Sequence, residues 1–543
     1  MRKWAILAVS FILSLPLWQC ANQTTPMGGP KDTIPPKLIK SNPEHKQKNF
    51  GGKTVDVTFD EYVTLFNAKD EILISPQVGK DVDFKFKKTT VSITPKEGWK
   101  DSTTYTIAFR EGIKDLTEGN PPENLRLAFS TGSNIDSSSI TGKVRLALTE
   151  KIPEKITVAL YQVDTFDIFE NSPTYFTIAD KKGKFSLENI KDGKYRIYAF
   201  DDKNKNLKVE SRTERFGFLS ESIDLHGSTD SLTISLVTLD TRAPKLNSIR
   251  NTGLFTRFAF NKAVNKYDLT IATNDSIIHS YGGNQSEIVV YNPKNIIDSL
   301  AITLHAVDSV LQPIDTTIYI KETKLNFIPE DFQVKGGKLN YDFAKSQLQY
   351  YWTFNKPVTT INYDSIFIKT DTASTVPTTA QDFRYDPIYK KLHLNKAIHK
   401  DSLYKNTKFK TELYLGKSAF VSIESDSSKQ NALSIPFIEA SQTGTLLVQT
   451  QTKEPHYVIQ LLTAGGELVE EVRDKPKHSF NFLTPQNYKI RVLIDSNNNG
   501  IWDAGNIFKN EEPERIFFYV TQDKKYEVPI RANWELGPLM LIF

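Results

Sequence analysis

One short pattern recurs three times along the chain, and it limits the fold more than any other feature. It has phenylalanine first, aspartate or asparagine second, glutamate or lysine third and valine fifth, and it occurs at 59–63, 260–264 and 354–358. An Asp-Ser pair follows each copy further along the chain. A pattern that returns in this way indicates a repeated structural unit. We therefore expect three related units, the latter two diverged from the first.

A second pattern links residues 193–215 to residues 486–515. Tyr-Arg-Ile at 195–197 corresponds to Tyr-Lys-Ile at 488–490, and four acidic or amide residues then follow in step. The four are Asp202, Asn204, Asn206 and Glu210 in the earlier copy and Asp495, Asn497, Asn499 and Asp503 in the later one. The chain therefore contains two units of a second kind, in the order first kind, second, first, first, second.

Short alternating apolar segments predict that both kinds of unit are β-sandwiches. Val55, Val57 and Phe59 alternate as in a strand that buries one face, and no stretch from residue 37 onward keeps the apolar period of a long helix. A chain of 543 residues exceeds what one core organises. We expect an all-β chain of tandem β-sandwiches at 37–133, 137–240, 243–325, 326–440 and 442–543.

The amino-terminal segment has the features of a secretion signal. Arg2 and Lys3 precede an apolar run from Trp4 to Trp18, which is long enough for a signal sequence and short for a membrane-spanning helix. Cys20 follows this run and is the single cysteine of the chain. We expect residues 1–19 to be a signal peptide and Cys20 to carry lipid. The alternative is a chance cysteine beside an ordinary cleavage site.

The segment after Cys20 is rich in proline and glycine. Residues 20–36 contain four prolines and two glycines, which predicts a semi-extended, lipidated tether. This stretch, CANQTTPMGGPKDTIPP, resembles the start of Bacteroidota outer-membrane lipoproteins that carry an immunoglobulin-like domain of the surface-layer SbsA type. The strand segments up to residue 133 and the loop at 112–120 are similar to that family as well.

The resemblance extends to the kinds of sandwich. The three units that share the first pattern would be immunoglobulin-like (37–133, 243–325 and 326–440). Gly142-Lys143-Val144 and the segment 183–187 resemble the prealbumin-like sandwich of carboxypeptidase regulatory domains, so residues 137–240 and 442–543 would be of that type. The family implies a binding or structural role at the cell envelope, anchored in the outer membrane on its periplasmic face or at the cell surface.

A tripeptide of aspartate, then serine or threonine, then an apolar residue or threonine recurs along the chain. It resembles the O-glycosylation sequon of Bacteroidota envelope proteins, which predicts glycan on some of the hydroxyls. The alternative is turn chemistry, because aspartate and serine favour turns. Copies begin at Asp32, Asp101, Asp230, Asp275, Asp298, Asp308, Asp315, Asp364, Asp371 and Asp401.

Residues 495–503 have the D-x-N-x-N-G spacing of a calcium loop. Calcium takes six to eight oxygen ligands, and glycine permits the sharp turn between them. The expected ligands are Asp495, Asn497, Asn499, the carbonyl of Ile501, and Asp503. Position twelve is Asn506 and not glutamate, so Glu511 or Glu512 would have to fold back to complete the set. The alternative is an asparagine-rich turn, which we favour for the earlier copy because Leu207 replaces Gly500 there.

Catalysis finds little support in the sequence. The eight histidines are scattered without a metal-binding spacing, and no G-x-S-x-G elbow or phosphate-binding glycine loop occurs. Removal of residues 1–19 lowers the formal charge from +4 to +2, so no basic stripe marks a nucleic-acid partner. We expect no catalytic residues and no cofactor other than calcium.

Two apolar segments leave alternatives open. Residues 534–543 are strongly apolar, which favours a last strand of the fifth sandwich over a segment that docks on a partner's sheet. Tyr350, Tyr351 and Trp352 form the densest aromatic cluster. Exposed, this cluster would suit a carbohydrate-binding platform, whereas alternating burial would explain part of it.

These observations predict a non-enzymatic, lipid-anchored rod of five sandwiches. As its role we expect an accessory subunit docked on an outer-membrane β-barrel complex, either the barrel-assembly machinery or a transporter. The alternative is a surface carbohydrate-binding or adhesion module, and a hydrolase is the least favoured. The partners would be the barrel complex and, through the lipid, the membrane.

Overall fold

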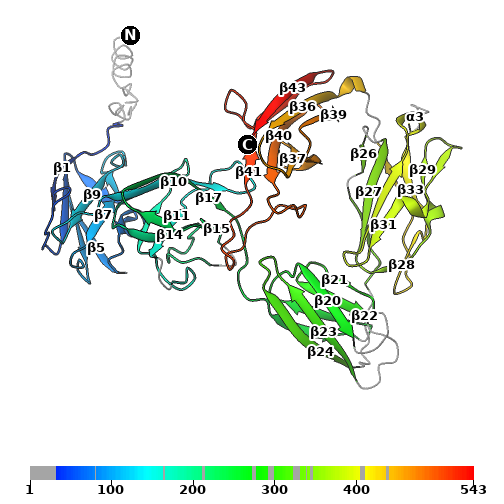
Figure 1. Ribbon diagram of the computed structural model, residues 1–543, viewed down its shortest axis with the longest axis horizontal. Coiled ribbons are helices and arrows are strands. Elements are labelled where there is room, and N and C mark those ends of the chain that lie inside the picture. Colours follow the sequence, from blue (N-terminus) through cyan, green and yellow to red (C-terminus); the bar gives the residue numbers. More distant parts are fainter. Residues whose placement is uncertain are drawn as a thin grey trace, which may run out of the picture. The chain divides into compact units, whose positions relative to one another are not determined.

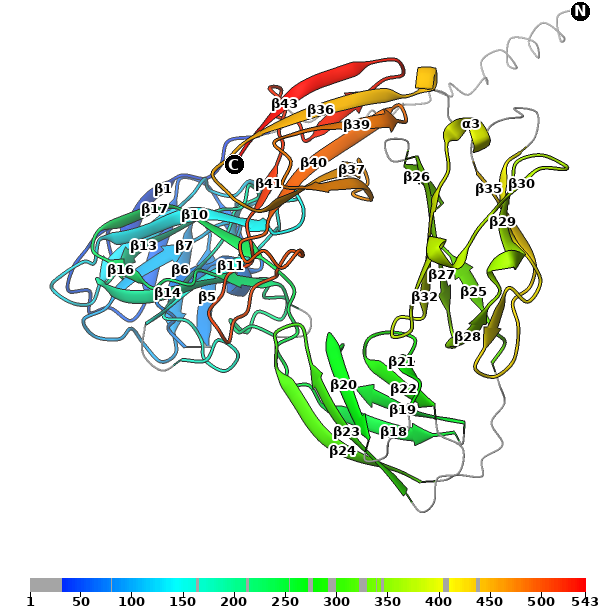
Figure 2. The ribbon, with the colours of Figure 1, turned by 45° about the vertical axis from the view of Figure 1, so that its right-hand side comes forward.

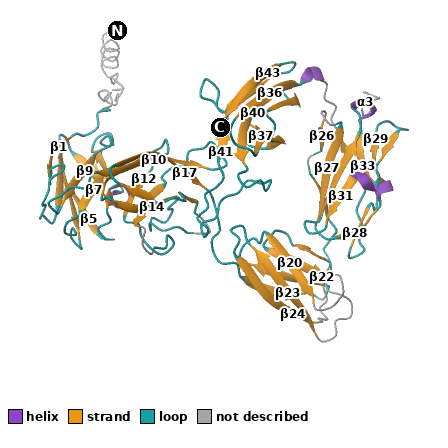
Figure 3. Ribbon diagram, in the orientation of Figure 1, coloured by secondary structure: helices purple, strands orange, loops and turns teal. Residues whose placement is uncertain are grey.

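The computed structural model describes residues 32–543 except 80, 163–165, 211–213, 253, 272–276, 292–298, 322–329, 338, 343–345, 404–409 and 436–439. The signal peptide, Cys20 and most of the tether lie outside the described residues. Strands form nearly all the regular structure, and the helices are short (Figure 3). The all-β prediction is confirmed. The chain divides into two compact units, residues 1–137 with 189–191 and residues 138–188 with 192–543.

The first unit holds the first sandwich, with sheets in the order β1-β2-β6-β5 and β4-β7-β9 and a two-stranded β3-β8 pair (Figure 1). Strand β2 alternates as VDVTF with Val55, Val57 and Phe59 buried, so one face of the sheet lies on the core. Its elements are β1 (Leu38–Asn42), β2 (Val55–Phe59), β3 (Val63–Leu65), α2 (Ala68–Glu71), β4 (Leu73–Ser75), β5 (Val82–Lys87), β6 (Thr90–Pro95), β7 (Thr104–Ala108), β8 (Ile113–Asp115) and β9 (Arg126–Ser130).

The second and fifth sandwiches, both in the second unit, share one topology. The sheets β13-β10-β17 and β12-β11-β14-β15 of the second correspond to β39-β36-β43 and β38-β37-β40-β41 of the fifth (Figure 2). In each, the first and last strands pair in parallel, and one further strand pairs with the central strand of the larger sheet. The two segments linked by the second sequence pattern therefore have the same fold.

The elements of the second sandwich are β10 (Ser138–Leu146), β11 (Thr157–Gln162), β12 (Tyr175–Ile178), β13 (Lys184–Ile190), β14 (Gly193–Phe200), β15 (Phe216–Phe218), β16 (Ile223–Leu225) and β17 (Ser228–Leu236). Those of the fifth are β36 (Gly444–Gln451), β37 (Tyr457–Thr463), β38 (Leu468–Arg473), β39 (Lys477–Leu483), β40 (Gln486–Ile494), β41 (Ile516–Phe518), β42 (Glu527–Ile530) and β43 (Glu535–Ile542). Strand β43 completes the fifth sandwich, as the apolar carboxyl-terminal segment predicts, and its Leu541 is fully buried.

The third sandwich packs the sheet β18-β19-β22-β21 against β20-β23-β24. The fourth has the sheets β25-β27-β32-β31, with β26 beside β27, and β30-β29-β33-β35, plus a β28-β34 pair. Elements of the third are β18 (Leu246–Asn251), β19 (Phe255–Phe260), β20 (Lys266–Ile271), β21 (His279–Tyr281), β22 (Glu287–Tyr291), β23 (Ser299–Val307) and β24 (Pro313–Lys321). Elements of the fourth are β25 (Val334–Gly336), β26 (Asn340–Asp342), β27 (Gln347–Phe354), β28 (Val358–Ile361), β29 (Ile366–Lys369), β30 (Thr375–Pro377), β31 (Phe383–Asp386), β32 (Lys391–Ala397), α3 (Lys400–Leu403), β33 (Glu412–Leu415), β34 (Phe420–Ser422) and β35 (Asn431–Ser434), with short 3-10 turns at Tyr363–Ser365, Ala380–Asp382 and Ala440–Gln442.

The threefold sequence pattern has the same structural role in each copy. Its phenylalanine is a buried core residue, and its second residue holds the segment that enters the sandwich. The side-chain oxygens of Asp60, Asn261 and Asn355 accept hydrogen bonds from the backbone N–H groups of Lys37, Lys245 and Gln333 at 2.7, 2.9 and 2.9 Å. The same three pattern residues donate their own N–H groups back to the carbonyls of those partners.

The third residue of the pattern differs in charge between copies. Lys262 is 3% exposed and pairs with the fully buried Asp308 at 2.5 Å. Lys356 is 5% exposed and pairs with Glu424 and Asp426 at 2.6 and 2.7 Å. In the first sandwich the position is Glu61, whose pKa is raised by burial and by nearby carboxylates, Asp115 first among them. The lysines thus neutralise buried acids in two copies.

Candidate functional site

The candidate calcium loop connects β40 to β41, and its acidic and amide side chains fold it tightly. The Asp495 carboxylate accepts the N–H groups of Asn499 and Gly500, each at 3.0 Å. The Asn499 amide oxygen in turn accepts the N–H of Ile501 at 2.9 Å. Gly500 has a positive φ of 90°, a conformation that glycine adopts readily. The D-x-N-x-N-G spacing therefore serves first to shape this turn.

Four of the five predicted ligand residues are brought together by these side-chain contacts. Asp503 lies at the centre, because its Oδ2 accepts the side-chain Nδ2 groups of Asn497 and Asn499, both at 2.7 Å. Ile501 contributes its backbone to the turn, and its side chain is 63% exposed. With each Nδ2 directed to Asp503, a cation at this point requires both amides to turn so that their oxygens face inward.

Glu514 is a member of this loop that the sequence pattern missed. Its carboxylate accepts the N–H of Ser496 at 2.6 Å and that of Asp503 at 3.0 Å. Burial raises the pKa of Glu514, and the nearby Asp503 and Asp495 raise it further. It occupies the place that we expected Glu511 or Glu512 to fill: Glu511 pairs with Asn506 through its backbone, and the side chain of Glu512 contacts Ser220.

A cation from the neighbouring strand β38 already lies against the loop. The Arg473 guanidinium lies 3.4 Å from Asp495 Oδ2 and also donates to the carbonyl of Gly500. Among the described residues, no group of three or more histidine, cysteine, aspartate or glutamate side chains is placed to hold a metal ion. A metal at this loop would therefore depend on amide and carbonyl oxygens in addition to its carboxylates.

The earlier copy of the loop, between β14 and β15, has the same construction. Asp202 accepts the N–H groups of Asn206 and Leu207 at 3.0 and 2.9 Å, as Asp495 does in the later copy. Glu214 is 1% exposed and accepts the N–H groups of Lys203 and Glu210, in the manner of Glu514. A buried glutamate that returns to the loop is thus common to both copies, although its distance along the chain differs.

The loop after β40 also joins the fifth sandwich to the second. Trp502, Ala504 and Ile507 pack against the core cluster of the second sandwich. Asn510 donates its side-chain amide to the carbonyl of Ser220, and Lys489 forms an ion pair with Glu150. In a rod, only sandwiches adjacent in sequence touch, so the rod hypothesis is wrong within this unit.

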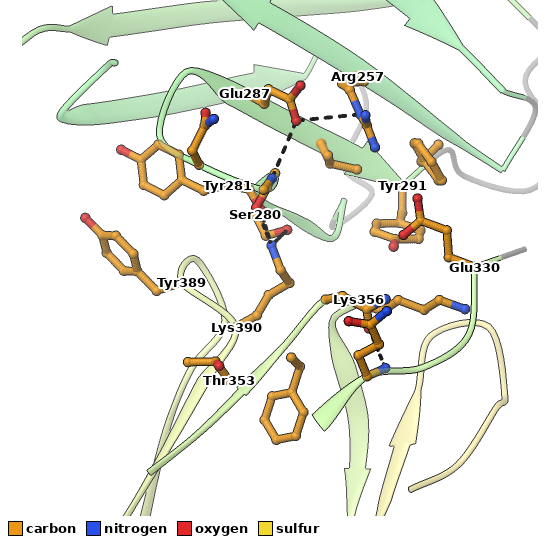
Figure 4. A pocket seen from close by; sticks show the side chains of 18 of the residues that line it. Arg257, Ser280, Tyr281, Glu287, Tyr291, Glu330, Thr353, Lys356, Tyr389 and Lys390 are labelled. Atoms are coloured by element: carbon orange, nitrogen blue, oxygen red, sulfur yellow. Dashed lines mark hydrogen bonds and ion pairs between the residues drawn. The ribbon is translucent and has the colours of Figure 1, made fainter. Parts of the chain in front are cut away.

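A polar cleft of about 550 Å³ lies where the third and fourth sandwiches meet (Figure 4). Arg257 and Glu287 lie on the wall formed by β19 and β22, and Lys356 and Lys390 reach the cleft from the fourth sandwich (Figure 4). Arg257 Nε is buried and makes no hydrogen bond to any described residue, since the Glu287 carboxylate is 3.9 Å away. The sequence patterns gave no sign of this cleft.

The turn between β31 and β32 fixes the two walls of the cleft to each other. Lys390 is 5% exposed and donates its ammonium to the carbonyls of Tyr281 and Gly282 in the third sandwich. The Tyr281 N–H donates to the carbonyl of Ile388 at 2.9 Å, and the Ile388 side chain packs on the core of the third sandwich. Burial lowers the pKa of Lys390 to about 8.

The aromatic cluster at 350–352 belongs mainly to the core. Tyr350 and Trp352 are 5% and 2% exposed and lie in the hydrophobic cluster of the fourth sandwich. Tyr351 points to the other face of β27, where the Lys391 ammonium lies 3.9 Å from its ring centroid. A platform of these three rings for carbohydrate is therefore absent from the described structure.

Comparison with known proteins identifies the first sandwich. The model of the bacterial Ig-like domain family matches residues 32–131. No curated protein matches the chain. Solved structures similar to it include surface layer protein SbsC, domains 1–6 (11% identity, 91% of this chain and 68% of that chain, TM-score 0.17). BcpA, the major pilin subunit of Bacillus cereus, is another (9% identity, 75% of this chain and 99% of that chain, TM-score 0.13).

The helices in the described part of the chain are short, which bears on whether they could span a membrane. No helix there is both long and apolar enough to cross a bilayer.

Proposed function

We propose that this chain is a non-enzymatic structural protein of the bacterial cell envelope, anchored to the outer membrane through lipid on Cys20. The observation that carries the proposal is a lone cysteine after a signal-like segment, followed by a proline-rich tether and a bacterial Ig-like domain. The β-sandwich chain supports it, because such modules present surfaces and space partners apart. Residues 1–19 act as the signal peptide and are removed.

Lipidation is tested by mass spectrometry of the mature amino terminus. Acylated Cys20 at the first position is the expected result. An unmodified terminus at Ala21, or a retained apolar segment, refutes the anchor. The variant Cys20→Ala should release the chain from the membrane fraction, since the acyl chains supply the membrane affinity.

As the role of the anchored chain we propose an accessory subunit of an outer-membrane β-barrel complex, either a barrel-assembly machine or a transporter. Tandem sandwiches without a described catalytic constellation suit a binding role better than turnover. Purification from native membranes in mild detergent, through a carboxyl-terminal tag, tests this. A stoichiometric barrel protein in the eluate supports the role and names the partner, whereas the chain alone refutes a stable complex.

We further propose that the loop at 495–503 binds calcium through Asp495, Asn497, Asn499, the Ile501 carbonyl and Asp503. The gathering of these side chains around one turn supports this, with both amides turning their oxygens inward when the ion binds. Trp502 provides a readout, because its indole donates to the carbonyl of Glu514 within the loop and can sensitise bound terbium. Luminescence that calcium displaces, and that Asp503→Asn abolishes while the exposed Asp523→Asn does not, is the expected result. No luminescence refutes the site and leaves an asparagine-rich turn.

O-glycosylation is proposed for the exposed hydroxyls of the recurring tripeptide. Glycopeptide mass spectrometry of the native protein tests it, and modification at none of these positions leaves turn chemistry as their explanation. The exposed candidates among the described residues are Thr33, Ser102, Ser231, Ser299, Ser309, Thr372 and Ser402.

A further inference from the structure

The cleft between the third and fourth sandwiches has the construction of a ligand site whose walls are held in place. Lys390 and Ile388 join the walls, one through charge-assisted hydrogen bonds to carbonyls and the other through apolar packing. Because these contacts already hold the two walls in place, less conformational entropy is lost when a ligand binds. The volume of about 550 Å³ is in the range of small-molecule sites.

The charges of the cleft limit the ligand to one that is neutral or carries a single negative charge. Its lining includes four cationic side chains, Arg257, Lys335, Lys356 and Lys390, and three carboxylates, Glu287, Glu330 and Glu424. Two of these cations already have partners in the described structure: Lys356 has Glu424 and Asp426, and Lys390 has backbone carbonyls. The four cations exceed the three carboxylates by a single charge, which is too little for a polyanion and disfavours nucleic acid.

Arg257 has a guanidinium nitrogen without a hydrogen-bond partner among the described residues. Its Nε is buried and forms no hydrogen bond to a described residue, whereas the Arg257 side chain as a whole is 40% exposed, so its accessible area lies on the other side-chain atoms. The Glu287 carboxylate at 3.9 Å is within ion-pair range but beyond hydrogen-bond distance. A ligand carboxylate in the cleft can therefore form a charge-assisted hydrogen bond with the exposed part of the guanidinium.

The other residues that line the cleft can hydrogen-bond the hydroxyl groups of a sugar, and one aromatic ring can pack against its apolar face. Side-chain amides and hydroxyls line the cleft at Asn284, Gln285, Gln333, Thr353 and Asn355, which offer both donors and acceptors. Tyr389 is 48% exposed, and its hydroxyl lies 3.4 Å from the Gln285 amide nitrogen. An exposed phenol ring beside polar groups is the arrangement that packs against the apolar face of a sugar.

We propose that this cleft binds a short saccharide that carries a carboxylate, with Arg257 pairing the carboxylate and Tyr389 packing against a sugar ring. The inference is independent of lipidation and of a barrel partner, because every group that it uses lies in the third and fourth sandwiches. It assigns carbohydrate recognition to this joint and not to the aromatic cluster at 350–352.

The test measures binding by titration calorimetry and saturation-transfer NMR, with residues 21–543 as the protein. The probe is the disaccharide of glucuronic acid and N-acetylglucosamine, with diacetylchitobiose as its neutral counterpart and free glucuronate as the carboxylate alone. We expect the acidic disaccharide to bind more tightly than either of the other two. Arg257→Gln should weaken it about 10- to 100-fold, the usual loss for a charge-assisted hydrogen bond.

Two further variants test whether a loss of binding is specific to the cleft. Arg384→Gln removes an exposed arginine of β31 that does not line the cleft, and it should leave binding unchanged. Tyr389→Ser should weaken binding of the disaccharide, whereas Arg384→Gln should not. Absence of binding by all three probes at millimolar concentration overturns the proposal. Equal binding by the wild type and Arg257→Gln overturns it as well.

Discussion

Replacing Lys262 with methionine should destabilise the third sandwich strongly and selectively. The Lys262 ammonium is 3% exposed and pairs with the Asp308 carboxylate, which is fully buried. It also donates to the Arg242 carbonyl at 3.0 Å. Methionine preserves most of the side-chain volume, so the change removes charge and hydrogen bonds with little effect on packing.

The expected magnitude follows from the charge that is left behind. Asp308 cannot relax toward water, because its other oxygen accepts the N–H groups of Val310 and Gln312 at 2.9 and 2.8 Å. Removing one partner of a buried ion pair costs about 3–5 kcal/mol. That loss corresponds to an increase of about 100- to 4,000-fold in the population of the opened sandwich.

Native-state hydrogen exchange is the suitable assay, because several sandwiches unfold separately and a single melting curve would mix them. Protection of the β19 amides should fall by the stated factor, while that of the β2 amides in the first sandwich stays unchanged. The control is Lys266→Met, on the exposed side of β20. If the protection of the β19 amides falls by less than about tenfold, or falls equally in both variants, the buried ion pair contributes less stability than we infer.

Three further outcomes are expected. Burial favours a raised pKa for Asp426, but Lys356 and Ser422 outweigh it and hold that pKa below its usual value. The fourth sandwich should therefore lose stability as pH falls below about 4, measured by native-state exchange of the β27 amides between pH 3 and 6, and Lys356→Met should flatten this dependence. Leu541→Ala should destabilise the fifth sandwich by about 2–5 kcal/mol, measured by native-state exchange of the β36 amides, because this fully buried side chain leaves a cavity. A change under about 1 kcal/mol would mean that β43 adds little to the core. Gly217→Ala should lower the opening free energy of the β15 amides by about 1–3 kcal/mol, measured by hydrogen exchange, because a Cβ there would lie 2.2 Å from the Ser235 carbonyl oxygen. Unchanged exchange would show that β15 and β17 move apart to accommodate the methyl group without loss of stability.

The internal repeats made the fold predictable, because each copy repeats its structural role. Asp60, Asn261 and Asn355 hold the entering segment in the same way, so a pattern of five residues was enough to relate three sandwiches. Strand alternation also gave the all-β class, since a period of two identifies a half-buried strand without knowledge of its partner.

The sites were less predictable, because they depend on residues that meet only after folding. Glu514 joins the loop of Asp495 because β41 brings the chain back, and no fixed spacing marks such a return, as the shorter span to Glu214 shows. Arg257 and Lys390 share a cleft across two sandwiches, which a pattern within one sandwich cannot indicate. Tyr350 and Trp352 suggested a platform, but β27 alternation directs both into the core.

The parallel pairing of β10 with β17 has a mechanical consequence. Ser139 lies opposite Ser228, and Leu146 lies opposite Leu236, so the chain enters the second sandwich at one end of this ladder and leaves at the other. Tension along the chain draws the two strands in opposite directions, and their hydrogen bonds bear the load together in shear instead of opening one at a time. Under force, this sandwich should outlast an equally stable one whose terminal strands peel apart.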